Sequence, residues 1–271
     1  MLLAQISDTH LKAGRKRAYG IVDTAGMLER CVSDIVQRPQ RPDAVIATGD
    51  LVDYGRPDEY ALLRELLAPL TMPLYLMPGN HDERNALRAA FPDHAYLRQW
   101  EPFIQYAIDD FPVRLVALDS VIPMQGGGTL CGERLAWLDR TLAARPDAPT
   151  VVALHHPPFV TGIGHMDRVG FDASAALAAV IARHKQVERV TAGHLHRPIT
   201  VRFAGTVAST CPSPAHQVAL DIAPDAKDDF IMEPPAYQLH WWNGRELVTH
   251  TAYIGEFDGP YPFRAGGTLI D

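Results

Sequence analysis

Five short groups of residues that commonly bind metal ions occur along this chain of 271 residues. Each group directly follows a short apolar run of the kind that forms a β-strand. The groups are Asp8-Thr9-His10, Gly49-Asp50, Gly79-Asn80-His81-Asp82, His155-His156-Pro157-Pro158 and Gly193-His194-Leu195-His196. In open α/β sheets ligands bind at the carboxyl ends of the strands, so five such groups can converge on one point. Two carboxylates, an amide and four imidazoles together predict a pair of metal ions.

Taken singly, each group is weak evidence for a metal site. Asp8 and His10 are two residues apart, so on an extended segment both side chains would fall on one side and could bind one ion. A lone copy of this pattern is more often a turn or a helix cap. Asp50 alone would be an ordinary loop aspartate, and Asp82 would serve as the N-cap of the following helix.

Backbone direction also limits which histidines can act together. Pro157 and Pro158 hold the preceding residues in an extended conformation. Neighbouring side chains on an extended segment point to opposite sides, so only one of His155 and His156 can bind a given ion. His194 and His196 are two residues apart and can converge. The coincidence of all five groups favours a metal site over five unrelated loops.

The charge of such a centre indicates its substrate. Two divalent ions bring about four positive charges, Asp8 and Asp50 remove two, and a bridging hydroxide removes another, which leaves about +1. The site therefore favours an anion, and a phosphodiester bound across both ions could be attacked in line by the hydroxide. Oxygen and imidazole ligands without thiolate suit Mn, Fe, Co or Zn.

The composition limits the class of partner. A hydrophobic content of 47% supports a full core, in one large α/β domain or two small ones. The formal charge of −7 and the pI near 5.9 argue against a broad basic face for nucleic acid. No apolar stretch approaches the roughly 20 residues that cross a bilayer, and the start lacks the basic region of a signal peptide. We expect a cytoplasmic protein that binds neither nucleic acid polymers nor membranes.

The apolar runs alternate with segments of helical length, which predicts βαβ units with helices on the outer faces. The expected strands are 2–7, 44–48, 74–77, 113–118, 150–154 and 187–192, and the expected helices are 23–37, 57–67, 132–142 and 173–184. From Ile199 to Tyr253 β-branched and aromatic residues alternate, and Asn243-Gly244 marks a hairpin. We expect this later part to form a second, more antiparallel sheet packed on the first.

Residues 1–254 are predicted to form one domain, with 198–254 as its more antiparallel part and 255–271 as a C-terminal tail. Residues 224–235 form an acidic excursion bounded by prolines. Unless they are buried, the later aromatic residues favour a homo-oligomer, a dimer or larger. These residues are Trp241, Trp242, Phe257, Tyr261 and Phe263. Their alternative role is the core of the second sheet.

The five groups, in this order, resemble the calcineurin-like metallophosphoesterase family. The family pattern is Asp-x-His, Gly-Asp, Gly-Asn-His-Asp/Glu, His-x and Gly-His-x-His, and each element occurs here between residues 8 and 196. The flanks 49–57, 73–82 and 212–217 are similar to the bacterial class III cyclic-nucleotide phosphodiesterase and glycerophosphodiesterase subgroup. The resemblance implies an α/β fold, a four-layer α-β-β-α sandwich of two mixed sheets flanked by helices.

By motif position, the resemblance also implies roles for individual residues. One ion would be held by Asp8, His10 and His196, the other by Asn80, His155 and His194, with Asp50 bridging them. His81 would contact the phosphate, next to Asn80, and stabilise or protonate the leaving alkoxide. Tyr19 and His216 are further candidates for substrate contact, although Tyr19 could simply cover the core and His216 could be an ordinary strand histidine. His156 receives no role and is expected to pack behind the site.

These inferences predict a binuclear metallophosphodiesterase that hydrolyses small phosphodiesters, either glycerophosphodiesters or cyclic nucleotides. A cyclic-nucleotide-specific phosphodiesterase is the alternative. A nuclease of the same fold would need a basic groove, which the acidic composition disfavours. A non-catalytic binding module would be expected to lack ligands, and none is missing from the five groups.

Overall fold

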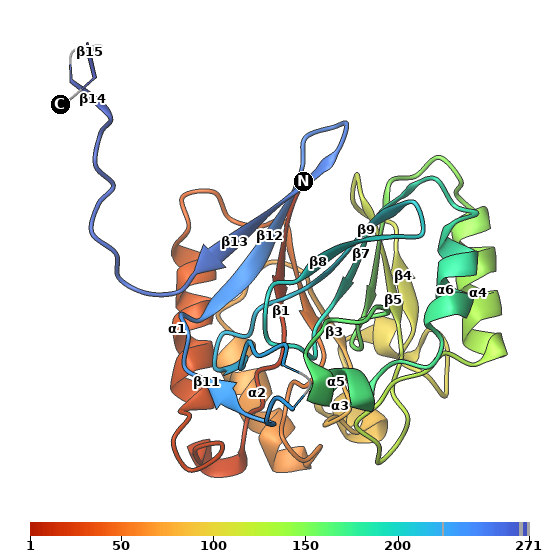
Figure 1. The fold of residues 1–271 in the computed structure, drawn as a ribbon, viewed down its shortest axis with the longest axis horizontal. Helices are drawn as coiled ribbons and strands as arrows, with labels where there is room; N and C mark the ends of the chain where they lie inside the picture. Colours follow the sequence, from red (N-terminus) through yellow and green to blue (C-terminus); the bar gives the residue numbers. More distant parts are fainter. Residues whose placement is uncertain (224, 266–267, 270–271) are drawn as a thin grey trace.

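Two mixed β-sheets pack against each other between two layers of helices in the computed structural model (Figure 1). The structure describes residues 1–223, 225–265 and 268–269. The strand order is β13-β12-β1-β2-β3 in the first sheet and β4-β5-β6-β7-β9-β8 in the second. The four-layer α/β architecture implied by the family resemblance is confirmed.

The first sheet is built around three parallel strands, β1 (Leu2–Ile6), β2 (Ala44–Thr48) and β3 (Leu74–Met77). Every residue of β1 and β2 is buried, as expected for strands covered on both faces. The connecting helices are α1 (Thr24–Gln37) and α2 (Pro57–Leu67). Antiparallel strands β12 (Ala236–Trp242) and β13 (Leu247–Tyr253) extend the sheet beyond β1.

The second sheet repeats this plan with parallel strands β5 (Arg114–Leu118), β6 (Thr150–Leu154) and β7 (Val187–Ala192). Helices α4 (Gly132–Ala143) and α6 (Ser174–Ile181) lie beside it (Figure 1). Its edges are β4 (Tyr106–Ile108) on one side and the pair β9 (Thr206–Thr210) and β8 (Thr200–Phe203) on the other.

Several short elements lie in the connections between these strands and helices. They are η1 (Ala13–Arg15), α3 (Arg84–Ala90), η2 (Ala95–Arg98), α5 (Gly164–Val169), β10 (Gln217–Val218) and β11 (Phe230–Ile231). A two-stranded pair, β14 (Arg264–Ala265) and β15 (Thr268–Leu269), follows β13 in the chain. The chain between β13 and this pair runs away from the two sheets (Figure 1).

Helix α2 shows how local sequence chemistry sets an element boundary. Pro57 occupies its first turn, where no backbone N–H is required. The Glu59 carboxylate accepts hydrogen bonds from the backbone N–H of Arg56 at 3.1 Å and of Tyr54 at 3.0 Å. These bonds satisfy donors that the helix cannot, so the expected start at Pro57 is confirmed.

The expectation that residues 199–253 form a sheet of their own is wrong. β12 and β13 join the sheet of β1, whereas β8 and β9 join the sheet of β7. The physical reason is that each parallel trio leaves an unpaired strand edge. The β12–β13 pair satisfies the edge at β1 and the β8–β9 pair satisfies the edge at β7, instead of the two pairs joining each other. The hairpin at Asn243-Gly244 is confirmed, since the Asn243 side chain accepts from the N–H of Arg245 and Glu246.

A buried polar network centred on Gln5 joins the two sheets. Its amide nitrogen donates to Thr48 Oγ1 at 2.9 Å and to the Ala192 carbonyl at 3.1 Å. Its amide oxygen lies 2.6 Å from the hydroxyl of Thr191 and 3.0 Å from Nε2 of His240. All four hydrogen-bonding positions of one buried amide are therefore used, and three strands of one sheet are connected to β7 of the other.

We predict that Gln5→Ala lowers the free energy of unfolding by about 2–4 kcal/mol, because it leaves several buried partners unsatisfied. Urea denaturation followed by circular dichroism measures this loss. The exposed Gln40→Ala is the control and should stay within about 0.5 kcal/mol of the native chain. Equal stability of the two variants would show that the network does not join the sheets energetically.

The expectations for the C-terminal tail and for the acidic excursion fall partly on residues that the structure does not describe. The predicted tail 255–271 includes residues 266–267 and 270–271, and the acidic excursion includes residue 224, all of which lie outside the described residues. Among the residues that are described, no helix combines the length and the apolar character needed to span a bilayer.

Candidate metal centre

The five ligand-rich groups meet where the carboxyl ends of β1, β2 and β3 face those of β6 and β7. Each candidate ligand is buried except Asn80, which is partly exposed. The structure thus brings together all seven residues that the sequence singled out as ligands. They are Asp8, His10, Asp50, Asn80, His155, His194 and His196.

Asp8, His10 and His196 form one tight cluster. Nε2 of His10 lies 3.2 Å from Nε2 of His196, and Nε2 of His196 lies 3.6 Å from Oδ1 of Asp8. Ligands at about 2.0–2.2 Å from one ion are separated from each other by about 3.0–3.6 Å. The spacing therefore fits one metal ion between these three side chains.

A second group surrounds His155. Its Nε2 lies 3.1 Å from the amide oxygen of Asn80, and its ring centroid lies 5.1 Å from that of His194. The Nε2 atom of His194 is buried and has no hydrogen-bond partner among the described residues. A buried nitrogen without a partner costs free energy, and a metal ion would remove this cost.

Asp50 lies between the two groups. Its Oδ2 atom is 3.6 Å from Nε2 of His10 in the first group and 3.3 Å from Nε2 of His155 in the second. Its Oδ1 atom accepts a hydrogen bond from the backbone N–H of His81 at 2.9 Å. One carboxylate is thus oriented by the backbone and can interact with both positions.

Backbone carbonyl groups set the tautomers of the candidate ligands. Nδ1 of His155 lies 2.8 Å from the Thr48 carbonyl, and Nδ1 of His196 lies 3.0 Å from the His216 carbonyl. A carbonyl oxygen only accepts, so Nδ1 carries the proton in both rings. Nε2 then presents its lone pair to the centre, which is the arrangement of metal-binding histidines.

The titratable groups of the pocket favour the binding of a cation. Burial raises the pKa of Asp8 to about 6. Burial opposes a charge on His155, but the Asp50 carboxylate outweighs this effect and raises the pKa of His155 to about 9. Burial lowers the pKa of His196 to about 3 and also lowers that of His194, so both rings are neutral. In the metal-free chain Asp50 therefore holds a proton on His155, which a bound divalent cation would displace. The neutral imidazoles of His194 and His196 and the buried carboxylates complete a donor set that fits such a cation.

The backbone at the site is held in an uncommon conformation. Five of the candidate ligands have positive φ, a region that non-glycine residues rarely adopt. They are Asp8 (57°), His10 (44°), Asp50 (49°), His194 (69°) and His196 (53°). The argument that Asp8 and His10 converge from an extended segment is therefore wrong. They converge because the chain turns sharply at each, and such strain is typical of functional sites.

Asp82 does not cap a helix, contrary to expectation. The N-cap of α3 is Glu83, whose side chain accepts from the N–H of Asn85 and Ala86. The Asp82 carboxylate instead accepts from the backbone N–H groups of Leu51 at 3.1 Å and Gly79 at 2.8 Å. It therefore links the loop that carries Asp50 to the loop that carries Asn80. This link between two loops is its structural role in place of helix capping.

Gly79 explains why these two loops approach so closely. A Cβ atom at this position would overlap the backbone nitrogen and the carboxylate of Asp50. Only glycine permits this contact.

A cavity of about 770 Å³ opens onto the candidate centre. His10, Asp50, Asn80, His194 and His196 line its floor together with His81. Tyr19 and His216, both predicted as substrate contacts, also line it, and their rings are 5.3 Å apart. The cavity is thus the place where a small molecule would meet the two ligand groups.

A model of the calcineurin-like phosphoesterase family matches residues 1–198. The chain belongs to the calcineurin-like phosphoesterase family. It is 41% identical, over 100% of both chains, to a probable glycerophosphodiester phosphodiesterase GpdQ from Arcobacter nitrofigilis. It is 34% identical to glycerophosphodiester phosphodiesterase GpdQ from Enterobacter lignolyticus, over 96% of this chain and 94% of that one.

Other relatives carry a different substrate in their names. The chain is 34% identical to the 3',5'-cyclic adenosine monophosphate phosphodiesterase CpdA from Pseudomonas aeruginosa, over 89% of this chain and 84% of that one. Among solved structures, a dimetal phosphatase from Danio rerio superposes with a TM-score of 0.68 at 17% identity, covering 94% of this chain and 97% of the other. That likeness supports the calcineurin-like fold only.

No sequence motif assigned a role to Asp53, which lies behind the first ligand group of this phosphoesterase. Its Oδ1 atom is 3.4 Å from Nδ1 of His10, and its Oδ2 atom is 2.9 Å from Nζ of Lys12. Burial opposes its charge, but the attraction of His10 and Lys12 outweighs burial and lowers the pKa of Asp53 to about 2. A permanent carboxylate behind a ligand histidine orients the ring and raises its basicity.

We predict that Asp53→Asn weakens metal binding by about ten- to a hundredfold, because it removes the charge that orients His10. Titration of metal-free protein with Mn²⁺ or Zn²⁺ in a calorimeter measures the change. Asp147→Asn, in an exposed turn far along the chain, is the matched control and should bind as the native protein does. Native affinity in Asp53→Asn would exclude this orienting role.

His156 packs behind the site, as expected. Its ring is buried, with Nδ1 2.8 Å from the Ser120 hydroxyl and Nε2 3.1 Å from the Gly126 carbonyl. Gly126 belongs to the cavity wall. Both ring nitrogens are thus used to hold a neighbouring loop, and neither is left for a ligand.

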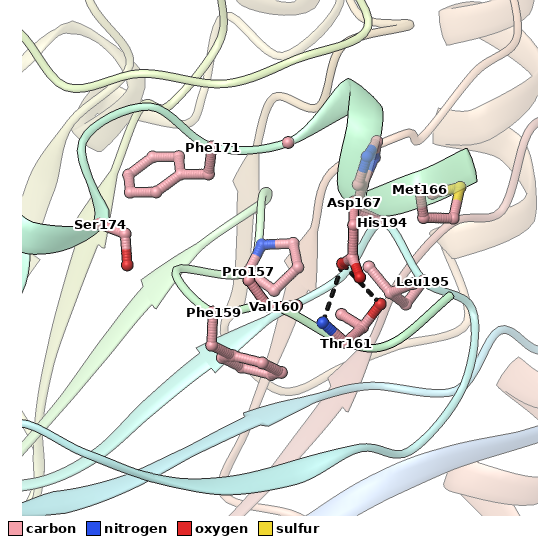
Figure 2. A pocket seen from close by; sticks show the side chains of 11 residues that line it. Pro157, Phe159, Val160, Thr161, Met166, Asp167, Phe171, Ser174, His194 and Leu195 are labelled. Carbon is pink, nitrogen blue, oxygen red and sulfur yellow. Dashed lines mark hydrogen bonds between the residues drawn. The ribbon is translucent and has the colours of Figure 1, made fainter. Parts of the chain in front are cut away.

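A smaller cavity of about 140 Å³ lies beside α5 and shares only His194 with the candidate ligands (Figure 2). Apolar side chains such as Phe159 and Phe171 form most of its wall. The Asp167 carboxylate accepts from the N–H and the hydroxyl of Thr161, both at 2.8 Å, and so anchors α5 (Figure 2). This anchored helix carries Met166 into the wall of the larger cavity.

Proposed function

We propose that this protein hydrolyses small phosphodiesters with a pair of metal ions held between the strand ends. The observation that carries the proposal is the place of Asp50 Oδ2, 3.6 Å from Nε2 of His10 and 3.3 Å from Nε2 of His155. One oxygen within reach of two ligand groups is what a binuclear centre requires. Relatives named as glycerophosphodiester and cyclic-nucleotide phosphodiesterases support the same reaction class.

The ligand assignment follows from the two groups. Asp8, His10 and His196 would hold one ion, and Asn80, His155 and His194 would hold the other, with Asp50 as the bridge. Oxygen and imidazole donors without a thiolate suit Mn, Fe, Co or Zn. When bound, the two ions would neutralise the phosphodiester charge and lower the pKa of a water molecule toward neutrality.

His81 is the proposed catalytic residue. Its Nδ1 lies 2.8 Å from the Asp53 carbonyl and therefore carries a proton, while its partly exposed ring lines the cavity. Its Nε2 is left for the substrate, where the protonated ring would donate to the leaving oxygen. The bond to the Asp53 carbonyl keeps the ring in the orientation that this transfer needs.

The cavity suits a small substrate better than a polymer. Its lining, among the residues that the structure describes, includes neither lysine nor arginine. A nuclease would need such residues along the phosphate backbone. Cyclic nucleotides remain the alternative substrate, since Tyr19 and Phe230 offer rings on which a base could stack.

Reconstitution of metal-free protein tests the reaction. Mn, Fe, Co and Zn are restored singly, and turnover is measured on glycerophosphodiesters, cyclic AMP, a chromogenic diester, a monoester and single-stranded DNA. We expect metal-dependent turnover of the small diesters. An absence of turnover with every metal would refute the enzyme, and a preference for DNA would favour the nuclease.

Two variants separate metal binding from catalysis. Asp50→Ala should lose both ions, because it removes the group shared by the two positions, and metal analysis measures this loss. His81→Ala should keep both ions and lose about 10²–10⁴-fold in kcat, the usual contribution of a general acid. Two bound ions in Asp50→Ala would remove Asp50 as the bridge.

We further propose that residues 1–254 act as one domain and that the following segment joins copies of the chain into a homo-oligomer. The support is that the backbone of this segment leaves the two sheets (Figure 1). Its aromatic side chains are exposed. Phe257 is 66%, Tyr261 is 74% and Phe263 is 87% exposed. Apolar rings gathered on a projecting segment are typical of an interaction surface.

We predict that removal of residues 255–271 lowers the molar mass measured by light scattering to that of the monomer, because the exposed rings would lose their partner copy. Phe257→Ser with Phe263→Ser should have the same effect without shortening the chain. A shortened chain that keeps the mass of the full-length protein would place the interface elsewhere.

A further inference from the structure

Residues 228–231 of the acidic excursion line the larger cavity. Strand β11 pairs with β10 in an antiparallel register that sets Phe230 opposite Val218, and the N–H of Ala219 donates to the Asp229 carbonyl at 2.9 Å. This pairing brings Asp228, Asp229 and Phe230 to the cavity that contains the candidate metal centre. A segment without an evident role in the sequence thereby becomes part of the site.

Three rings form a continuous surface beside these carboxylates, here termed the ring wall (Tyr19, His216 and Phe230). The centroids of Tyr19 and Phe230 are 4.9 Å apart, and His216 lies 5.3 Å from Tyr19 and 5.2 Å from Phe230. His216 is only 2% exposed, and its Nδ1 atom has no hydrogen-bond partner in the described part of the chain. A wall with an unsatisfied polar atom is one that a ligand would stabilise.

The charges around the cavity are unbalanced. Asp228 and Asp229, here termed the acidic rim, line the opening, and the described lining residues contain no lysine or arginine. Oδ1 of Asp228 lies 3.3 Å from Nε2 of His165. The nearby cations are directed elsewhere: Arg197 pairs with Glu233 at 2.6 Å, Lys12 pairs with Asp53 at 2.9 Å, and Lys227 does not line the cavity.

We propose that the acidic rim and the ring wall select the alcohol part of the phosphodiester, favouring an alcohol that carries an ammonium group over one that carries a second anion. The proposal rests on the proposed phosphodiesterase activity. Carboxylates attract the cation, and aromatic faces bind a quaternary ammonium group through cation–π interaction. A second phosphate or carboxylate on the alcohol part would instead face the two carboxylates of the rim, where the described lining residues offer no lysine or arginine to offset them.

Kinetics on three diesters of glycerol phosphate test this selection. The alcohols are choline, glycerol and glycolate, which carry a positive, neutral and negative charge. With the metal-loaded protein, we expect kcat/KM to fall from choline to glycerol to glycolate, with about tenfold between the extremes, because exposed charges contribute modestly. Salt at 0.5 M should shrink the ratio by screening. Equal kcat/KM for all three would overturn the proposal.

Variants of the rim locate the effect. Asp228→Asn with Asp229→Asn should lower the choline-to-glycolate ratio about tenfold, whereas Asp225→Asn should keep the native ratio. Asp225 lies in the same excursion and is exposed but does not line the cavity, so it is the matched control. An equal loss on all three diesters in the double variant, with the ratio preserved, would overturn the proposal.

A binding measurement distinguishes this inference from the proposed function. Choline and its uncharged isostere 3,3-dimethylbutanol are compared by saturation-transfer NMR on the metal-free protein. Choline should bind several-fold more tightly than the isostere, and the double rim variant should remove the difference. Equal binding would overturn the selection even if the enzyme is active. A lack of turnover with preferential choline binding would refute only the phosphodiesterase.

Discussion

The buried carboxylates of Asp8 and Asp50 are the constraint on which the site depends. Both are almost fully shielded from water, and an unpaired buried charge is expensive. The protein surrounds them with imidazoles instead of lysine or arginine. In the metal-free chain Asp50 raises the pKa of His155, and a bound cation would take the place of that proton. Backbone carbonyls accept the Nδ1 protons of His155 and His196, which leaves Nε2 of each ring free to bind a metal beside these carboxylates.

Holding these groups together requires strain and close packing. Five candidate ligands have positive φ, and Gly79 permits a contact that any Cβ atom would block. The free-energy cost of this strain is offset by the packing of the scaffold. The ligand loops follow strands whose residues are nearly all buried. Gln5 completes this scaffold, since its single amide connects both sheets a few residues before Asp8. The packing between the two sheets therefore also fixes the positions of the ligand loops.

The proposed selectivity of the site has a different physical origin from its proposed chemistry. The chemistry lies at the strand ends, where buried groups are held rigidly. The ring wall and the acidic rim come from the β10–β11 segment and the loop after Asp8, where exposed carboxylates act through modest and screened interactions. The names of the relatives refer to glycerophosphodiesters in some cases and to cyclic nucleotides in others.

The sequence by itself determined the strand ends, most helix boundaries and the seven candidate ligands, because these depend on local apolar runs, caps and short motifs. Only the tertiary structure decided which sheet each later strand joins, since both sheets offer an open edge to similar apolar strands. It also assigned Asp82 to the ligand loops, Asp53 to His10, and Asp228 and Asp229 to the cavity. Each of these roles depends on a contact between residues that no local pattern encodes.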